Sequence, residues 1–169
     1  AFREDPVRIL RVARFSARFP DFSIAPETMI LMRGMVANGE ADSLVAERVW
    51  QEIAKGLMEQ KPSLMFEVLQ SSGLLQKQLP SLVDNAVALA ALDLAASQNQ
   101  PLAVRFATLQ LPSQLPAEAL KAPSDCTQLA QVVAKILKNY KADLNAQQMY
   151  ECLERGDAIR QPDRFALAL

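Results

Sequence analysis

The sequence contains no histidine among its 169 residues. Imidazole is the usual general base near neutral pH and a common ligand of zinc and other transition metals. The absence of histidine therefore excludes a Ser-His-Asp triad, an imidazole general base and a His-ligated metal site.

Glycine and aromatic residues are also scarce, with 5 Gly, 2 Tyr and 1 Trp. These low numbers disfavour a β-sandwich or a β-barrel. Ala, Leu, Gln, Glu, Lys, Arg and Met dominate instead, and these residues form helices readily. No segment keeps the alternation of apolar and polar residues that is typical of strands. The sequence therefore predicts an all-α fold, a multi-helix array of short antiparallel helices.

Cysteines, long apolar runs and excess positive charge are equally limited. Cys126 and Cys152 are the two cysteines, and their distance in the sequence favours free thiols over a disulfide. The longest apolar runs fall short of the roughly 18 residues that a membrane span needs, and no signal-type segment opens the sequence. These features predict a soluble, cytoplasmic protein without membrane contact. A net charge of −1 means that any RNA contact is local.

Proline, glycine and capping residues indicate where the helices begin and end. Asp5 and Pro6 predict a first helix that ends near Phe19. Similar signals predict helices over residues 26–36, 43–60, 62–73, 79–97, 101–111, 124–140 and 145–156, and one from residue 162. The helix over residues 79–97 is apolar nearly all round, which predicts burial. Charge is concentrated before residue 80, which predicts two domains, residues 1–79 and residues 80–169.

An acid and two arginines recur every third residue of the first predicted helix. Asp5, Arg8 and Arg11 therefore lie on one helical face. Such a face is either solvated, with intrahelical pairs worth about 0.2–0.5 kcal/mol each, or a binding row. Phe15 and Phe19 lie close to the same face, which favours a row that is partly enclosed by protein.

Two further charged segments have a structural and a functional interpretation. In the segment from Leu44 to Glu52, Glu47 and Glu52 favour the first turns of a helix. Trp50 is expected to anchor the core there, and Arg48 to pair with an acid or support another loop. A second segment places lysines at positions 135, 138 and 141, which form either a solvated face or a contact to a phosphate backbone.

Four blocks together resemble a known family. They are residues 4–15 (EDPVRILRVARF), residues 24–28 (IAPET), Gly39-Glu40 and residues 44–52 (LVAERVWQE). Their order and spacing resemble the class II tRNA nucleotidyltransferases, the CCA-adding enzymes, which share a superfamily with bacterial poly(A) polymerases. Ala46 stands where the family usually has proline, a departure that affects only the start of a helix.

A weaker resemblance continues to the end of the chain. Residues 104–109 (VRFATL) resemble the approach to the His-Asp motif of the bacterial enzymes with a phosphohydrolase (HD) domain, but residues 110–113 (QLPS) contain no His-Asp pair. Residues 129–134 and 157–165 resemble later parts of that domain. The resemblance implies a shortened, degenerate HD-like body without metal ligands or phosphatase activity.

The resemblance implies a neck domain (residues 1–79) for base selection and RNA binding, and a body domain (residues 80–169) for tRNA contact. The resemblance also implies that the catalytic head is missing from this sequence, so the chain is expected to hold no catalytic or metal residue and to be inactive alone. The match assigns Asp5 and Arg8 to an amino-acid template that selects the incoming base, and Arg11 to a nearby nucleotide contact. Glu4, Glu47, Arg48 and Glu52 belong to the matched motifs in a structural role.

The full-length enzyme of this family adds CMP and AMP to the 3′ end of tRNA from CTP and ATP, with Mg²⁺ held by the head. Cytosine and adenine both present an exocyclic amino donor beside a ring-nitrogen acceptor. A carboxylate accepts from the first group and a guanidinium donates to the second, whereas uracil and guanine offer the reverse. Two alternatives remain, a poly(A) polymerase and a non-enzymatic helical RNA-binding or scaffold module. The oligomeric state is not predicted.

Overall fold

The computed structural model describes residues 5–109, 120–139 and 144–169. Within these ranges every regular element is a helix and no strand occurs, which confirms the all-α prediction. Glu4 lies outside the described residues, as do Arg3, Lys141 and residues 110–113.

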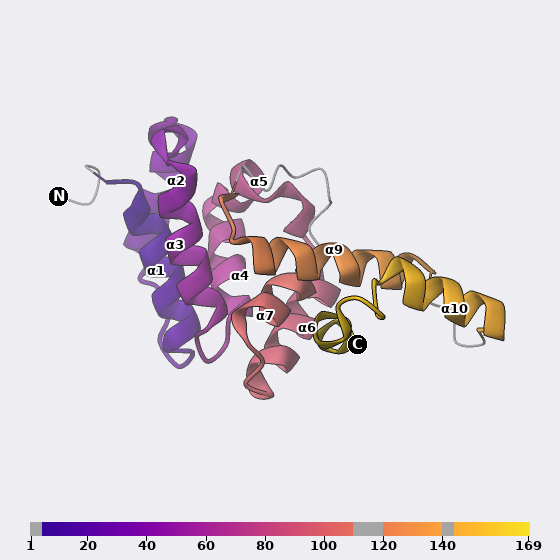
Figure 1. The fold of residues 1–169 in the computed structure, drawn as a ribbon. Helices are drawn as coiled ribbons and strands as arrows, with labels where there is room; N and C mark the ends of the chain where they lie inside the picture. The colour runs from indigo at the N-terminus through magenta and orange to yellow at the C-terminus, as the bar shows by residue number, and fades with distance from the viewer. Residues whose placement is uncertain (1–4, 110–119, 140–143) are drawn as a thin grey trace.

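The helices follow one another with short connections, and α1 and α10 lie at opposite ends of the molecule (Figure 1). The α-helices are α1 (Val7–Arg18), α2 (Pro26–Ala37), α3 (Ala46–Leu57), α4 (Ser63–Ser72), α5 (Leu74–Gln78), α6 (Ala86–Ser97), α7 (Leu102–Thr108), α9 (Ser124–Asn139), α10 (Ala146–Arg155) and α11 (Pro162–Ala168). Two short 3₁₀ helices, η2 (Glu40–Ser43) and η3 (Pro80–Leu82), complete the described elements.

The predicted helix over residues 79–97 is wrong in its first half. Pro80 opens η3, because proline has no N–H to continue the helical hydrogen bonds. Asp84 then adopts a left-handed φ of 55°, and the side chain of Asn85 accepts from the Ala88 N–H to start α6. The predicted burial holds for one face of this segment, where Leu82, Ala88 and Leu92 are buried. The other face is exposed, since Val87 and Leu94 of α6 are 75% and 59% exposed.

The main apolar core forms where α1 packs against α3 and α4. Ile9 and Leu10 are buried there, and the small side chains of Ala13 and Ala17 leave room for close helix contact. This core includes buried residues on both sides of residue 79, from Ile9 to Cys126. A second apolar cluster joins α9, α10 and α11 through Val132, Ile136, Cys152 and Phe165. The division into two domains at residue 79 stays a prediction.

Trp50 and the cysteines fit their predicted roles. The Trp50 ring packs edge-on against Phe106, with ring centroids 5.5 Å apart, so it links α3 to α7. Cys126 and Cys152 are buried free thiols. Burial and the neighbouring Asp125 raise the pKa of Cys126 to about 11, which keeps this thiol protonated at neutral pH.

Arg105 on α7 is a buried cation that the sequence pattern did not reveal as structural. Its side chain is enclosed, and it donates to the carbonyls of Gln100 (2.8 Å), Leu57 (2.9 Å) and Glu59 (3.3 Å). It therefore satisfies carbonyl groups at the end of α3 and in the connection between α6 and α7. Burial lowers the pKa of Arg105, but the guanidinium stays charged.

Replacing Arg105 by Met leaves these carbonyls without a donor in a buried place. We expect Arg105→Met to lower the free energy of unfolding by about 2–4 kcal/mol. Chemical denaturation measures this loss. Arg160→Met, which changes an exposed arginine, is the matched control and is expected to cost less than about 0.5 kcal/mol. Equal unfolding midpoints for the two variants would contradict the structural role of Arg105.

Candidate nucleotide- and RNA-binding site

The first turn of α1 brings Asp5 and Arg8 together. The Oδ1 atom of Asp5 accepts from the Val7 N–H at 3.1 Å, and its backbone carbonyl accepts from the Arg8 N–H at 3.1 Å. Asp5 therefore caps the helix, as its position before Pro6 predicts. The spacing of three residues leaves the side chains of Asp5 and Arg8 on neighbouring positions of one face.

Arg48 of α3 reaches across to this carboxylate. Its Nη2 atom donates to Asp5 Oδ2 at 2.9 Å, which confirms that Arg48 pairs with an acid. Partial burial opposes ionisation of Asp5, but the Val7 N–H, Arg48 and the charge of Arg11 outweigh it and hold the pKa of Asp5 below its ordinary value. The carboxylate is therefore ionised at neutral pH and can only accept hydrogen bonds.

The buried carboxylate of Glu52 organises a second group of charges between α1 and α3. Glu52 is 4% exposed and lies 3.1 Å from Arg14 Nη1, 3.6 Å from Arg11 Nε and 3.8 Å from Lys55 Nζ. Two buried atoms of this group, Glu52 Oε2 and Arg14 Nε, have no hydrogen-bond partner among the described residues. Arg11 is therefore oriented by Glu52, and three cations surround one acid.

Arg8 differs from its neighbours in the row. Among the described residues it forms no hydrogen bond or ion pair, and its side chain is partly exposed. Its guanidinium carries only donors, and its position follows that of the Asp5 carboxylate by one helical turn.

The structure thus brings together Asp5, Arg8, Arg11, Arg48 and Glu52. Glu47 is not part of this group. It pairs with Lys121 at 3.4 Å, and its own backbone N–H together with Lys121 lowers its pKa. Glu47 therefore links α3 to the segment that precedes α9.

An exposed aromatic cluster continues along the same helix. The rings of Phe15 and Phe19 stack at 6.3 Å, and Phe22 meets Phe19 edge-on at 5.9 Å. Guanidinium groups of Arg14 and Arg18 lie 5.1 and 5.4 Å from the Phe15 and Phe19 ring centroids. Phe22 was missed by the sequence reasoning because it follows the end of α1 and so breaks the helical spacing.

The polar row is partly enclosed by protein, as expected, since the side chains of Asp5 and Arg14 are only 28% and 17% exposed. Phe15 and Phe19 do not supply this enclosure. Each ring is 45% exposed, because α1 packs through the opposite side that carries Ile9, Leu10 and Ala13. The rings instead border a shallow, mainly apolar hollow of about 220 Å³ that extends to Ile24.

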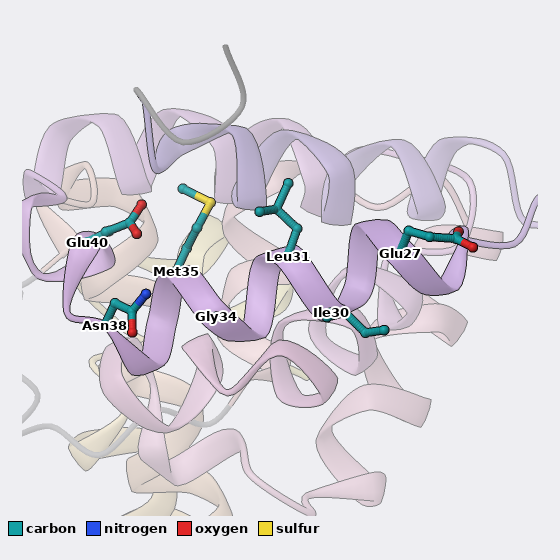
Figure 2. Close-up of a pocket in the computed structure, with 7 residues that line it drawn as sticks. All are labelled: Glu27, Ile30, Leu31, Gly34, Met35, Asn38 and Glu40. Carbon is teal, nitrogen blue, oxygen red and sulfur yellow. The ribbon is translucent and has the colours of Figure 1, made fainter.

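A further cavity of about 280 Å³ lies along α2 (Figure 2). It is lined by Glu27, Ile30, Leu31, Gly34, Met35, Asn38 and Glu40. The lining includes two carboxylates and no cation, so the cavity is poorly suited to a phosphate. None of the predicted nucleotide-binding residues lines it.

No metal site is evident in the part of the chain that the structure describes. Within it, no three or more Asp, Glu or Cys side chains come close enough together to hold an ion. None of the described helices is long and apolar enough to cross a membrane.

Comparison with known proteins places these features in a family. Residues 21–85 match the family model described as "Probable RNA and SrmB- binding site of polymerase A". The whole chain is 45% identical to a "Multifunctional CCA protein" of Paraburkholderia phytofirmans, covering 52% of that relative. Proteins with the same name from Verminephrobacter eiseniae and Paracidovorax citrulli are 46% and 48% identical over 98% of the chain, which covers 50% of each. No solved structure matches.

The chain belongs to the family of CCA-adding enzymes and bacterial poly(A) polymerases. Within it, the chain corresponds to the neck and body region and spans about half the length of the curated relatives it matches. The first of these alignments extends over 211 positions for 169 residues, so about 42 positions hold no residue of this chain.

Removing the charge of Arg48 tests what keeps Asp5 ionised. We expect Arg48→Met to raise the pKa of Asp5 toward about 3.9, the ordinary aspartate value, because the Val7 N–H remains while Arg48 is lost. NMR titration of the Asp5 carboxyl carbon measures this pKa.

The sign of the pH effect follows from the lowered pKa. The stabilisation by ionised Asp5 is present above the unfolded-state pKa and is lost as the pH falls through the folded-state pKa. Arg48→Met is therefore expected to weaken the acid-dependent loss of stability below about pH 4. Arg18→Met is the control and leaves the titration unchanged. An unaltered Asp5 pKa in Arg48→Met contradicts the assignment.

Proposed function

We propose that this chain is the base-selecting and RNA-binding part of a tRNA nucleotidyltransferase that adds CMP and AMP to the tRNA 3′ end. The substrates are CTP and ATP, the partner is tRNA, and the protein acts in the cytoplasm. The name of the relatives supports CCA addition, and the description of the matched family model supports RNA binding. In this proposal Mg²⁺ is held by the catalytic head of the full-length enzyme, and this chain supplies no ligand to it.

The single observation that carries the proposal is the geometry of Asp5. Its two oxygens each receive one donor, from Val7 and from Arg48, and these donors fix the carboxylate in orientation. An ionised carboxylate has about four lone-pair positions, so each oxygen can still accept one more hydrogen bond. An exocyclic amino group of cytosine or adenine supplies that donor.

Arg8 completes the selection because it can only donate. Its guanidinium, one turn from Asp5, pairs with the ring-nitrogen acceptor beside the amino group. Uracil and guanine present a carbonyl toward Asp5 and an N–H toward Arg8, so both contacts fail. An unpaired buried polar group costs about 1–3 kcal/mol, which corresponds to a preference of roughly 5- to 150-fold.

Three further residues position the template or the nucleotide in this proposal. They are Arg11, Arg48 and Glu52. Glu52 orients Arg11, whose exposed guanidinium contacts the nucleotide beside the template. Arg48 positions Asp5 and keeps it ionised. The alternative of a poly(A) polymerase rests on the polymerase named in the description of the matched family model.

Nucleotide selection by the full-length enzyme that contains this chain tests the template. We expect Asp5→Asn and Arg8→Ala to reduce the preference for CTP and ATP over UTP and GTP by about 5- to 150-fold. Asn retains an oxygen that can cap α1, so the first variant preserves the helix. Single-nucleotide incorporation into tRNA lacking CCA, with each triphosphate in turn, measures the preference.

Two variants away from the template control for charge. Asp21→Asn and Arg18→Ala change the same charges near the end of α1 and are expected to leave selection unaltered. Unchanged selection in Asp5→Asn and Arg8→Ala removes the assigned role. Comparing tRNA lacking CCA with an unstructured RNA separates the two activities, since a poly(A) polymerase extends the second with AMP alone.

A further inference from the structure

A basic cavity of about 310 Å³ lies between α9, α10 and the segment that leads into α11. Four cations line it, Lys135, Arg155, Arg160 and Arg164, together with the two carboxylates of Glu154 and Asp157. Positive charge is therefore in excess around a hollow of suitable size for an anion. None of the predicted template residues takes part in it.

The hydrogen bonds and ion pairs of Arg164, which lines this cavity, leave one of its nitrogen donors without an acceptor. Arg164 donates from Nη1 to Gln128 Oε1 at 2.7 Å and lies 3.5 Å from Asp157 through Nη2. Its third donor, Nε, is buried without a hydrogen-bond partner among the described residues. A buried N–H without an acceptor costs about 1–3 kcal/mol, so the protein's own acceptors satisfy the guanidinium of Arg164 only in part.

Apolar packing holds the walls of the cavity together in addition to the contacts of Arg164. Val132, Cys152 and Phe165 of the second apolar cluster join the three helices. Gly156 ends α10 directly against Phe165, and a Cβ at this position would lie 2.4 Å from the ring. This close approach fixes the turn that carries Asp157 and Arg160, so the cations do not depend on one another for their positions.

We propose that this basic cavity binds a phosphate group of the RNA partner. The proposal rests on the proposed function for the identity of that partner. Guanidinium groups suit this ligand because their planar fork pairs with two phosphate oxygens at once. Arg155 already pairs with Glu151 and Arg164 with Asp157, each at 3.5 Å, so the attraction for a phosphate comes from the net positive charge of the whole lining.

The position of the cavity in the fold decides whether it affects RNA binding or nucleotide selection. Its walls belong to α9, α10 and α11, which lie away from α1 in Figure 1, with α3, α4 and α7 between them. A phosphate bound there belongs to a part of the RNA remote from the incoming nucleotide. The cavity therefore contributes to RNA affinity and leaves the choice between CTP and UTP unchanged.

The test compares Arg160→Gln with Lys138→Gln in the 169-residue chain. Arg160 lines the cavity and is exposed, whereas Lys138 lies on α9 outside it, so both changes remove one surface charge. Fluorescence anisotropy measures binding of an RNA hairpin with a single-stranded 3′ end at several salt concentrations. We expect about 3- to 10-fold weaker binding for Arg160→Gln, and a salt slope smaller by about 0.7–0.9. Lys138→Gln is expected to change the affinity less than about twofold.

A second titration with inorganic phosphate distinguishes the sources of the anion. It is expected to shift the amide NMR signals of residues 155–160 in the unmodified chain and less in Arg160→Gln. A phosphate response without any effect of Arg160→Gln on RNA affinity overturns the RNA assignment and leaves a small-anion site. Equal RNA affinity for both variants, with no phosphate response, overturns the cavity as a site. If the unmodified chain binds no RNA, the proposed function fails for this chain as well.

Discussion

The buried carboxylate of Glu52 determines how α1 lies against α3. A carboxylate that is 4% exposed is costly without compensation, and here three cations supply it, two of them from α1. α1 therefore cannot rotate without separating Arg11 and Arg14 from Glu52. This orientation turns Ile9 and Leu10 into the core and leaves Asp5 and Arg8 at the accessible end of the helix.

The packing of α1 on α3 also determines the charge and orientation of the Asp5 carboxylate. Arg48 lies one helical turn before Glu52 on α3, so the same packing brings it within 2.9 Å of Asp5. The carboxylate is then fixed, ionised and accepting only, while Arg8 only donates. In the proposed role, selection of cytosine and adenine needs one acceptor and one donor in fixed order, and Asp5 and Arg8 would supply them. The basic cavity near α10 acts on a different part of the RNA in our proposal, so affinity and selection are separable.

Local signals in the sequence predicted much of the fold. Proline and asparagine marked the start of α2, α10 and α11, and Asn145 forms the expected capping box. Contacts between residues distant in the sequence were not predictable in the same way. Asp5 and Arg48 are 43 positions apart, and only the packing of α1 on α3 shows that they pair. The break at Pro80 was missed although Pro80, Asp84 and Asn85 interrupt the apolar residues there. Arg105 was missed because burial of a cation leaves no periodic pattern.

The most direct test of base selection removes the amino group from the substrate and not only the residue from the protein. Full-length enzyme and its Asp5→Ala variant are given CTP or a CTP analogue that lacks the exocyclic amino group. We predict that loss of the amino group lowers incorporation by about 10- to 100-fold in the unmodified enzyme, as expected for a lost charge-assisted hydrogen bond, and has little effect in Asp5→Ala. An equal penalty in both enzymes would contradict the role of Asp5 as the acceptor for that amino group.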